Sequence, residues 1–582
     1  MQNENNEYRN HRTKNSNLKS NEKDLANSKW TGLEFFNNIK NLSPKLWSLN
    51  FLTTLKLNDI NLTRVPAEIG KLTSLQKLDL SSNKLRSLPT EIGDLINLIE
   101  LYLNNNSLHS LPHELGRLFQ IQILGLDGNP LSQEVLSWNA KKNGSAQLIS
   151  CLLDRSSVCE RPEERHWQLL VPDKRRTAEN SFIVMCYNVL CDKYCTKSVY
   201  GYCPSWALEW EYRKKLIMNE ILQHQGDILS LQEVETEQFY NFFLPELQKH
   251  GYEGIFSAKS RARTMSEDES KKVDGCAIFF KTTRFTLKKH DMMEFNQLAA
   301  ANSKDASDML NRVMTKDNIG IVALLETNDD FGFGQNSDRT KRLLMVSNVH
   351  MAWEPEYSDV KLIQTVLLMQ FLQKFREEVD NISILPGKNG TLGRSIPLVM
   401  CGDLNSLPDS GPVEFLDKGR ISTDHEDFQS LDYGGFLSRL SITRKGEMCA
   451  ELTHAFQLKR TYESLEYSNY TFHFRGVIDW VYYSYNALMP IAELASVDQE
   501  YLKRNKLIGW PHPHFPSDHQ SLLVEFEFVD KTINQNGDYA NPQWMQQRRQ
   551  PQPWIIISSM YHVVGIFPLL RQKVLSTDQE LC

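Results

Sequence analysis

The chain has 582 residues, which is too long for one ordinary hydrophobic core, so two or more domains are expected. Hydrophobic residues make up 41% and charged residues 24% of the sequence, a balance typical of soluble globular proteins. The formal net charge of −7 argues against a basic coat for nucleic acid over the whole chain, but a local basic groove beside an acidic site remains compatible with it.

The first 28 residues predict a disordered arm. They are rich in Asn, Lys and Glu and lack the apolar stretch of a secretory signal. The ten cysteines of the chain show no paired zinc spacing, which favours free thiols in a reducing compartment.

Residues 29–150 contain a repeat of 23 residues. Leucines at three positions recur through four units, beginning with Leu52, Leu55 and Leu57, with Ile121 replacing one leucine in the fourth unit. Asn and Pro each hold one fixed position in successive units: Asn83, Asn106 and Asn129, and Pro66, Pro89 and Pro112. This is the leucine-rich-repeat pattern, in which each unit buries its leucines by stacking on its neighbours. The Asn side chains are expected to satisfy backbone groups at the turn after each strand. The solenoid predicts a partner-binding surface; the alternative is that it only stabilises the neighbouring domain.

Residues 151–180 are predicted to be a linker, and residues 181–530 a second domain. Short apolar runs alternate there with helical patterns such as Asp359–Val379, whose apolar side chains share one face. The runs that predict strands are 181–187, 227–231, 275–280, 320–325, 343–347, 397–401, 477–482 and 521–526. Strands with interleaved helices predict a layered α/β domain with two sheets.

Residues 531–582 form a divergent tail with an apolar run, Trp554–Leu570. The run is at the lower length limit for a membrane span and is interrupted by polar residues and by Pro568. We therefore expect no membrane association, and a partner-binding or variant tail is favoured.

Polar side chains follow several of the predicted strands. Asn188 ends the first strand and could bind a phosphate or metal-bound water, or simply cap a turn. Glu233 ends the next and is a suitable Mg²⁺ ligand, although an isolated Glu would equally suit a surface salt bridge. His350 could donate to a phosphate oxygen or a leaving group, although a lone His is more often structural.

The segment Cys401–Ser406 is a more specific pattern. Gly402 is expected to let the backbone turn closely after the strand. Asp403 and Asn405 are then expected to project from the same side of an extended segment. Such a pair suits orienting an attacking water and binding a second metal or an oxyanion.

A third constellation joins an Asp in a strand to an Asp-His pair. Asp479 lies in the apolar run 477–482, where a carboxylate is costly unless it is hydrogen-bonded. Its expected partner is His519, and Asp518 would contact metal or the nucleophilic water. Since no zinc motif, nucleophile elbow or phosphate-binding glycine loop competes with this set, the sequence predicts metal-assisted phosphodiester hydrolysis.

These motifs together resemble the endonuclease–exonuclease–phosphatase superfamily over about residues 181–530. Their order behind leucine-rich repeats resembles the carbon catabolite repressor protein 4-type poly(A) deadenylases. The motifs are YNVL, LQEVE, DGCAIFFK, VHMAWEPEYSDVKLIQ, CGDLNSLPDSGPVEFL, GVIDWVYYS and PHPHFPSDH. The resemblance implies a DNase-I-like four-layer α/β sandwich preceded by a leucine-rich-repeat solenoid.

The resemblance also implies a role for each matching residue. Glu233 resembles the principal Mg²⁺ ligand of a site for two Mg²⁺ ions. The rest of the metal and phosphate site would be Asn188, Asp403, Asn405, Asp518 and His519, with His350 contacting phosphate and Asp479 orienting His519. Pro355 and Phe474 would pack against an adenine base, and Asn296, Asn311 and Lys316 would contact RNA. Lys259, Arg261 and Arg263 would form either a phosphate-facing loop or a solvated basic turn.

The implied activity is 3′-to-5′ shortening of mRNA poly(A) tails with release of 5′-AMP. The implied partners are single-stranded poly(A) RNA, a Caf1-type deadenylase on the repeats, and the NOT scaffold complex. The implied location is cytoplasmic and also nuclear. Two alternatives stay open: a phosphatase of the same superfamily, against which the base-packing pair weighs, and a scaffold with an inactive nuclease domain, against which the full acidic set weighs.

Overall fold

The computed structural model describes residues 31–36, 42–139, 141, 143–171, 181–302, 309–328, 341–383, 396–429, 431, 433, 437 and 450–529. The predicted arm (1–28) and tail (531–582) lie outside these residues. Within them, no helix combines the length and apolar character needed to cross a membrane.

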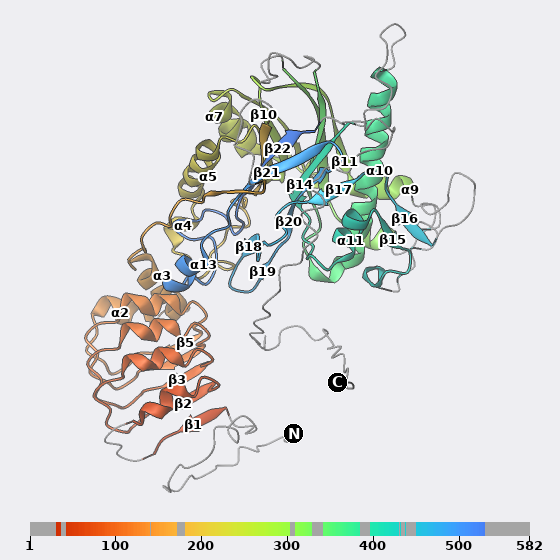
Figure 1. The fold of residues 1–582 in the computed structure, drawn as a ribbon. Helices are drawn as coiled ribbons and strands as arrows, with labels where there is room; N and C mark the ends of the chain where they lie inside the picture. Colours follow the sequence, from red (N-terminus) through yellow and green to blue (C-terminus); the bar gives the residue numbers. More distant parts are fainter. Residues whose placement is uncertain are drawn as a thin grey trace, which may run out of the picture. The chain divides into compact units, whose positions relative to one another are not determined.

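The repeat region forms a parallel sheet with one short strand per unit (Figure 1). The strands, in spatial order, are β1 (Gly32–Glu34), β2 (Thr54–Lys56), β3 (Lys77–Asp79), β4 (Glu100–Tyr102) and β5 (Ile123–Gly125). Opposite them lie the 3₁₀ helices η1 (Pro44–Ser48), η2 (Ala67–Lys71), η3 (Thr90–Asp94) and η4 (His113–Arg117), followed by α2 (Gln133–Asn139) and α3 (Gly144–Asp154). The repeated prolines directly precede η2, η3 and η4, where a fixed φ favours the helical start.

The repeated asparagines bridge successive units, as predicted. Asn106 Nδ2 donates to the carbonyls of Leu80 (2.9 Å) and Leu103 (3.0 Å), and its Oδ1 accepts from the amide of Leu85 (3.1 Å). Asn83 and Asn129 make the equivalent bonds one unit earlier and later. Each Asn is buried, so these bonds satisfy backbone groups that water cannot reach.

The second region is built on two mixed sheets. The first has the order β6 (Trp167–Leu169), β21 (Leu488–Leu494), β22 (Leu522–Phe528), β7 (Ser181–Asn188), β8 (Ile228–Glu235), β10 (Asp274–Lys281) and β9 (Tyr252–Ala258). The second has the order β11 (Phe285–Glu294), β12 (Ile319–Thr327), β13 (Leu343–His350), β14 (Leu398–Asp403), β20 (Asp479–Ser484) and β17 (Leu458–Arg460). Strand β6 pairs with β21, so part of the segment predicted as a linker is an edge strand of this region.

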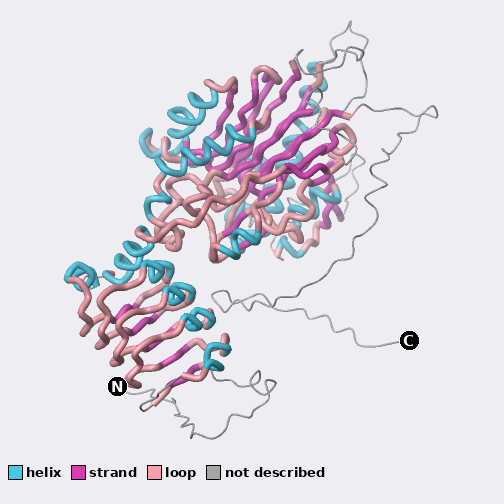
Figure 2. The backbone as a smooth tube through the Cα atoms, turned by 60° about the vertical axis from the view of Figure 1, so that its left-hand side comes forward, coloured by secondary structure: helices cyan, strands magenta, loops and turns pink. Residues whose placement is uncertain are grey.

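Helices cover the outer faces of the two sheets, with the strands between them (Figure 2). The first sheet is covered by α5 (Trp210–His224), the π-helical turn η5 (Phe239–Phe243) and α7 (Leu244–Gln248), while α4 (Ser205–Leu208) packs on the loop after β7 and α6 (Thr236–Gln238) follows β8. The second is covered by α9 (Phe295–Asn302), the π-helical turn η7 (Met309–Val313), α10 (Ser358–Ser383) and α11 (Gly411–Lys418). This arrangement confirms the predicted layered α/β sandwich.

Shorter elements lie in the connections. These are η6 (Ser260–Thr264), α8 (Glu267–Ser270), η8 (Pro355–Tyr357), β15 (Arg420–Ser422), η9 (Glu426–Phe428), β16 (Glu451–Thr453), β18 (Asn469–Tyr470), β19 (Arg475–Gly476) and α13 (Gln499–Arg504). Strands β18 and β19 pair as a small hairpin.

Alternation along the central strands aims their polar ends into the space between the sheets. In β7, Phe182, Val184 and Cys186 face the other sheet, and Met185 faces the helices. Asn188 is next in the inward series because side chains alternate with period two. In β14, Val399 and Cys401 face inward in the same way, which places Asp403 inward too.

Candidate active site

The site residues lie where strands of the two sheets end. Asn188 and Glu233 come from β7 and β8, and His350 and Asp403 from the parallel neighbours β13 and β14. Asp479 begins β20, which runs antiparallel to β14 and pairs Asp479 directly with Asp403. The loop before β22 supplies Asp518 and His519. Five strands and one loop therefore converge at one edge of the sandwich.

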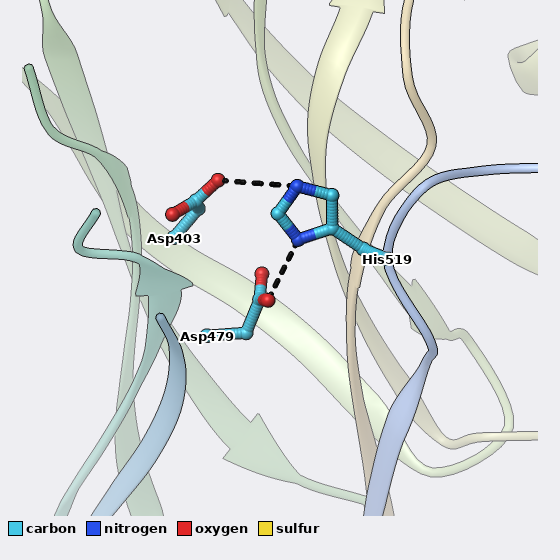
Figure 3. Close-up of side chains that lie close together, drawn as sticks. All are labelled: Asp403, Asp479 and His519. Atoms are coloured by element: carbon cyan, nitrogen blue, oxygen red, sulfur yellow. Dashed lines mark hydrogen bonds and ion pairs between the residues drawn. The ribbon is translucent and has the colours of Figure 1, made fainter. Parts of the chain in front are cut away.

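His519 lies between two carboxylates (Figure 3). Its Nδ1 is 2.7 Å from Asp479 Oδ2, and its Nε2 is 3.7 Å from Asp403 Oδ2. Burial disfavours the charged imidazolium, but Asp479, Asp518 and Asp403 outweigh this effect and raise the pKa of His519 well above its ordinary value. The predicted Asp479–His519 pair is present, and it holds His519 in one orientation.

Asn188 links the two sheets across the site. Its Nδ2 donates to Glu233 Oε1 (3.2 Å) in the same sheet and to Asp403 Oδ2 (3.0 Å) in the other. Burial, followed by the neighbouring Asp479 carboxylate, raises the pKa of Asp403 to about 7 although His519 lowers it. The structure thus brings Asn188, Glu233 and Asp403 together.

A β-bulge aims Glu233 at the site. Gln232 pairs with Cys276 and Val234 with Gly275, so Glu233 is an extra residue in β8, and its φ is +58°. Without the bulge, the alternation that sends Leu229 and Leu231 to the helices would send Glu233 there as well. The bulge turns it inward, where its Oε2 accepts from the amide of Cys191 (3.1 Å). Burial and then the charge of Asp274 raise the pKa of Glu233.

Asp518 is held by two residues that the sequence patterns did not single out. Its Oδ2 accepts from the hydroxyl of Tyr200 (2.9 Å) and from Asn469 Nδ2 (3.2 Å). Its Oδ1 is 3.8 Å from His519 Nε2 and has no hydrogen-bond partner. Tyr200 and Asn469 lie outside any periodic apolar run, so no pattern marked them.

Asn405 and His350 complete the set around Asp403. Asp403 Oδ1 accepts from the amide of Asn405 (2.9 Å), whose φ of +47° closes a tight local turn. The Asn405 side chain donates to the carbonyl of Met351 (3.2 Å), so it does not lie on a simple extended segment beside Asp403. His350 Nε2 is 3.8 Å from Asp403 Oδ2, and burial and the nearby Lys259 charge lower the pKa of His350 well below its usual range.

Gly402 has a different role from the one expected. It lies inside β14 and makes no turn, so that prediction was wrong. A Cβ atom there would lie 2.4 Å from the Val349 carbonyl oxygen on β13. Glycine is required because the two parallel strands pass so close together, directly behind His350 and Asp403.

The side-chain donors fit a hard divalent cation. One ligand atom each from Asp403, Asp479 and His519 lie within 4.8 Å of one another. In the described residues, Asp479 Oδ1 and Asp518 Oδ1 are buried oxygens without a hydrogen-bond partner. Buried carboxylates that repel one another need a compensating positive charge. Carboxylate and amide oxygens are also the ligands that Mg²⁺ prefers.

The two predicted base-packing residues are both exposed, on separate segments. Pro355 begins η8, five residues after His350. Phe474 is 38% exposed. Its ring lies beside the Leu407 side chain, because a Cβ atom built on Gly476 would lie 2.7 Å from Phe474 and 2.8 Å from Leu407. Phe474 lies between β18 and β19, and Asn469 of β18 donates to Asp518 (3.2 Å), so the hairpin that carries Phe474 is attached to the rim of the site.

The predicted RNA contacts already have protein partners. Lys316 Nζ forms an ion pair with Glu354 Oε1 (2.6 Å), and Asn296 Nδ2 donates to Ser260 Oγ (2.8 Å). Asn311 is exposed, and its carbonyl accepts from Thr315. Lys316 therefore braces the segment that carries Pro355, and direct RNA contact by these three residues stays a prediction.

The basic loop at residues 259–263 is tied down by acidic groups. Lys259 Nζ lies 2.7 Å from Asp274 Oδ2, and Arg261 lies 2.6 Å from Asp274 Oδ1. Arg263 pairs with Glu294 (3.1 Å). Lys259 and Asp274 are buried, whereas the Arg263 side chain is 60% exposed, so the loop is solvated only at its far end. The positive charge of Lys259 sits close enough to Glu233 that each shifts the pKa of the other.

Comparisons with known proteins place this geometry in a family. Residues 185–519 match the Endonuclease/Exonuclease/phosphatase family, and residues 34–135 match a leucine-rich repeat region. The CCR4-NOT transcription complex subunit 6-like-B of Xenopus laevis is 54% identical over 507 residues, covering 86% of this chain and 92% of that protein. The chain belongs to the Ccr4 family of exoribonucleases.

The Ccr4 family extends to distant relatives of this chain. The CCR4-Not complex 3′-5′-exoribonuclease subunit Ccr4 of Schizosaccharomyces pombe is 44% identical over 537 residues, covering 86% of this chain and 74% of that protein. Among solved structures, ANGEL2, a 2′,3′-cyclic phosphatase, aligns at 23% identity and a TM-score of 0.48 over 63% of this chain and 99% of its own. The family-model matches and the curated relatives confirm the predicted family, enzyme class and fold.

Proposed function

We propose that this Ccr4-family enzyme shortens the poly(A) tails of mRNA from the 3′ end and releases 5′-AMP. The observation that carries the proposal is the set of Glu233, Asp403, Asp479, Asp518 and His519 converging on one buried edge of a nuclease-family sandwich. The names of its relatives, CCR4-NOT subunit 6-like and 3′-5′-exoribonuclease, support the same activity. An inactive scaffold would have no physical need for buried carboxylates of this kind.

The site is proposed to hold two Mg²⁺ ions. Glu233, Asp403 and Asp518, together with the amides of Asn188 and Asn405, are the residues that would hold them; the charged His519 would join them as a ligand only after losing its Nε2 proton. When bound, such ions polarise the phosphate and lower the pKa of the attacking water. The unpartnered oxygen of Asp518 supports this assignment.

The side chains of the chain itself would orient the reacting groups. Asp403, fixed by Asn188 and Asn405, is placed to align the attacking water. His519, charged and held by Asp479, is placed to stabilise negative charge that develops on the phosphate. His350, kept neutral by burial, can donate one hydrogen bond to a phosphate oxygen.

Adenine selectivity is proposed to come from Pro355 and Phe474. Stacking of a base on such surfaces contributes about 1–3 kcal/mol. The repeats are proposed to dock a Caf1-type deadenylase and so join the NOT scaffold complex, because a solenoid offers an extended binding face. The proposed location is cytoplasmic and nuclear.

The direct test incubates purified protein with 5′-labelled oligo(A) and oligo(C) in Mg²⁺ and in chelator. We expect stepwise 3′ shortening of oligo(A), 5′-AMP as the product, slower shortening of oligo(C), and no reaction in chelator. Release of inorganic phosphate without shortening would instead indicate a phosphatase. Equal rates on the two RNAs would refute the adenine preference.

A further inference from the structure

Trp353 presents an unused aromatic surface beside the site. It is 70% exposed, more than any other large apolar side chain in the described part of the chain. Among the described residues, no aromatic, cation–π or side-chain hydrogen-bond contact holds its indole. Single exposed apolar residues are common at protein surfaces, so exposure alone decides nothing. What distinguishes Trp353 is where its backbone lies and how firmly that backbone is held.

The segment that carries Trp353 is anchored on both sides. The amide of Met351 donates to the Asp403 carbonyl (2.9 Å), and the amide of Ala352 donates to the buried Gln364 side chain (3.0 Å). On the other side, Glu354 pairs with Lys316 (2.6 Å). The indole therefore projects from a backbone fixed directly to an active-site residue. A surface ordered in advance can bind a base without a further loss of backbone entropy.

The position of Trp353 fits a neighbouring nucleotide. It follows His350 by three residues and precedes Pro355 by two, so its Cα lies within about 7 Å of that of Pro355. Phe474 and Leu407 supply exposed apolar surface at the rim formed by the Asp403 loop. Proteins that track single strands use a series of such surfaces, on which successive bases stack.

We infer that Trp353 stacks on the base of the second nucleotide from the 3′ end of the RNA, next to the base held by Pro355 and Phe474. The inference rests on the proposed function for the direction of the RNA. It adds a second base-binding position to the site, which would favour unpaired, stacked purine runs over isolated adenines. Trp353 touches no reacting atom, so its contribution falls on substrate binding.

The test combines protein and RNA changes. Trp353→Ala, Trp353→Phe and the control Tyr240→Ala are compared on oligo(A) and on oligo(A) abasic at the second nucleotide. Tyr240 is 59% exposed in η5, and its ring packs edge-on against Phe239 and Phe256. We expect Trp353→Ala to lose about 5- to 150-fold in kcat/KM on intact RNA, mainly through a higher KM. Trp353→Phe should stay within about fivefold of wild type, and Tyr240→Ala should be unchanged.

The RNA change gives the decisive readout. For wild type, the abasic substitution should lower kcat/KM by the same factor as Trp353→Ala does on intact RNA. For Trp353→Ala it should lower kcat/KM no further, because the stacking partner of the base is already absent. Equal sensitivity of wild type and Trp353→Ala to the abasic site would overturn the inference. Measuring Kd for the same RNAs in chelator separates the two claims. If Kd rises with Trp353→Ala or with the abasic site, and rises no further when both are combined, the inference holds. If such a protein does not shorten RNA, only the proposed function is contradicted.

Discussion

Glu233 shows how far single residues could be predicted. The motif around it marked a carboxylate at the end of a strand, but regular alternation would have turned that carboxylate toward the helices. The bulge opposite Gly275 and Cys276 depends on pairing between strands that are distant in sequence, so no local pattern contains it. The Asp479–His519 pair was easier, because a carboxylate in an apolar strand needs a specific partner. Tyr200 and Asn469 could not be found in this way, since one lies in a loop and the other in a strand of two residues.

Removing the Glu233 carboxylate should abolish activity without weakening the fold. Mutating a residue that only supports a metal ligand typically lowers metal affinity or activity by about 10–100-fold. Glu233 is proposed to bind the ion itself, so Glu233→Gln is expected to slow RNA shortening by at least about 100-fold. Because burial raises the pKa of Glu233, its charge disfavours folding at neutral pH, and the metal-free variant should melt no lower than wild type. The exposed Glu237→Gln is the matched control. A variant that retains full activity would refute the metal assignment.

Metal affinity should depend on pH through Asp403. Its pKa of about 7 in the metal-free protein means that protons compete with the ion below that pH. The Kd for Mg²⁺ is therefore expected to rise by up to about tenfold per pH unit below 7 and to level off above it. The stability of the metal-free protein should change with pH in the opposite direction. Because the Asp403 pKa is raised in the folded state, the free energy of unfolding falls as the pH rises toward 7. Calorimetry at pH 6, 7 and 8 checks this; a Kd independent of pH would contradict it.

At the scale of elements, long apolar runs were predictable and irregular ones were not. Strands β12 and β13 are largely buried on both faces, so 319–325 and 343–346 are continuously apolar and easily recognised. Strand β11 is missed because it mixes Lys, His and Asp with its apolar residues, and β6 because it has three residues at a sheet edge. The small β18–β19 hairpin that precedes Asp479 and carries Phe474 between its strands depends on tertiary contacts.

The close approach of β13 and β14 can be tested at Gly402. Alanine there would place its Cβ 2.4 Å from the Val349 carbonyl oxygen, so the strands must separate behind His350 and Asp403. We expect Gly402→Ala to lower the free energy of unfolding by about 3 kcal/mol or more. Gly32→Ala, whose Cβ would have 3.7 Å of clearance in β1, should change it little. Urea denaturation measures both, and equal stability of the two variants would contradict this reading of β14.

At the scale of the whole molecule, the repeats and the sandwich were recognised for different reasons. The repeats follow from a strict period, which fixes their strands, prolines and asparagines together. The sandwich follows from the order of its polar motifs, which the family match over residues 185–519 confirms. Neither pattern predicted the structure of residues 151–180, where β6 pairs with β21 from the far end of the domain.

The asparagine ladder should stabilise the repeats without affecting chemistry. Asn106→Ala leaves the buried Leu85 amide without a partner, whereas the Leu80 and Leu103 carbonyls keep the bonds from Asn83 and Asn129. We expect it to destabilise the repeats by about 1–3 kcal/mol, with an unchanged rate on free RNA. Asn97→Ala, which removes one exposed bond to Thr73, is the control. Thermal unfolding and RNA shortening are measured on the same samples, and loss of activity below the unfolding transition would contradict the separation of roles.

We propose that one metal-dependent site removes adenylates from a 3′ end. The most direct measurement follows a labelled RNA with a mixed-sequence body and a 3′ tail of adenosines, in Mg²⁺, by gel and product analysis. We expect the tail to shorten one nucleotide at a time, 5′-AMP to accumulate, and the reaction to slow at the junction with the body. Cleavage within the body, or an intact tail under conditions where the folded protein binds Mg²⁺, would contradict it.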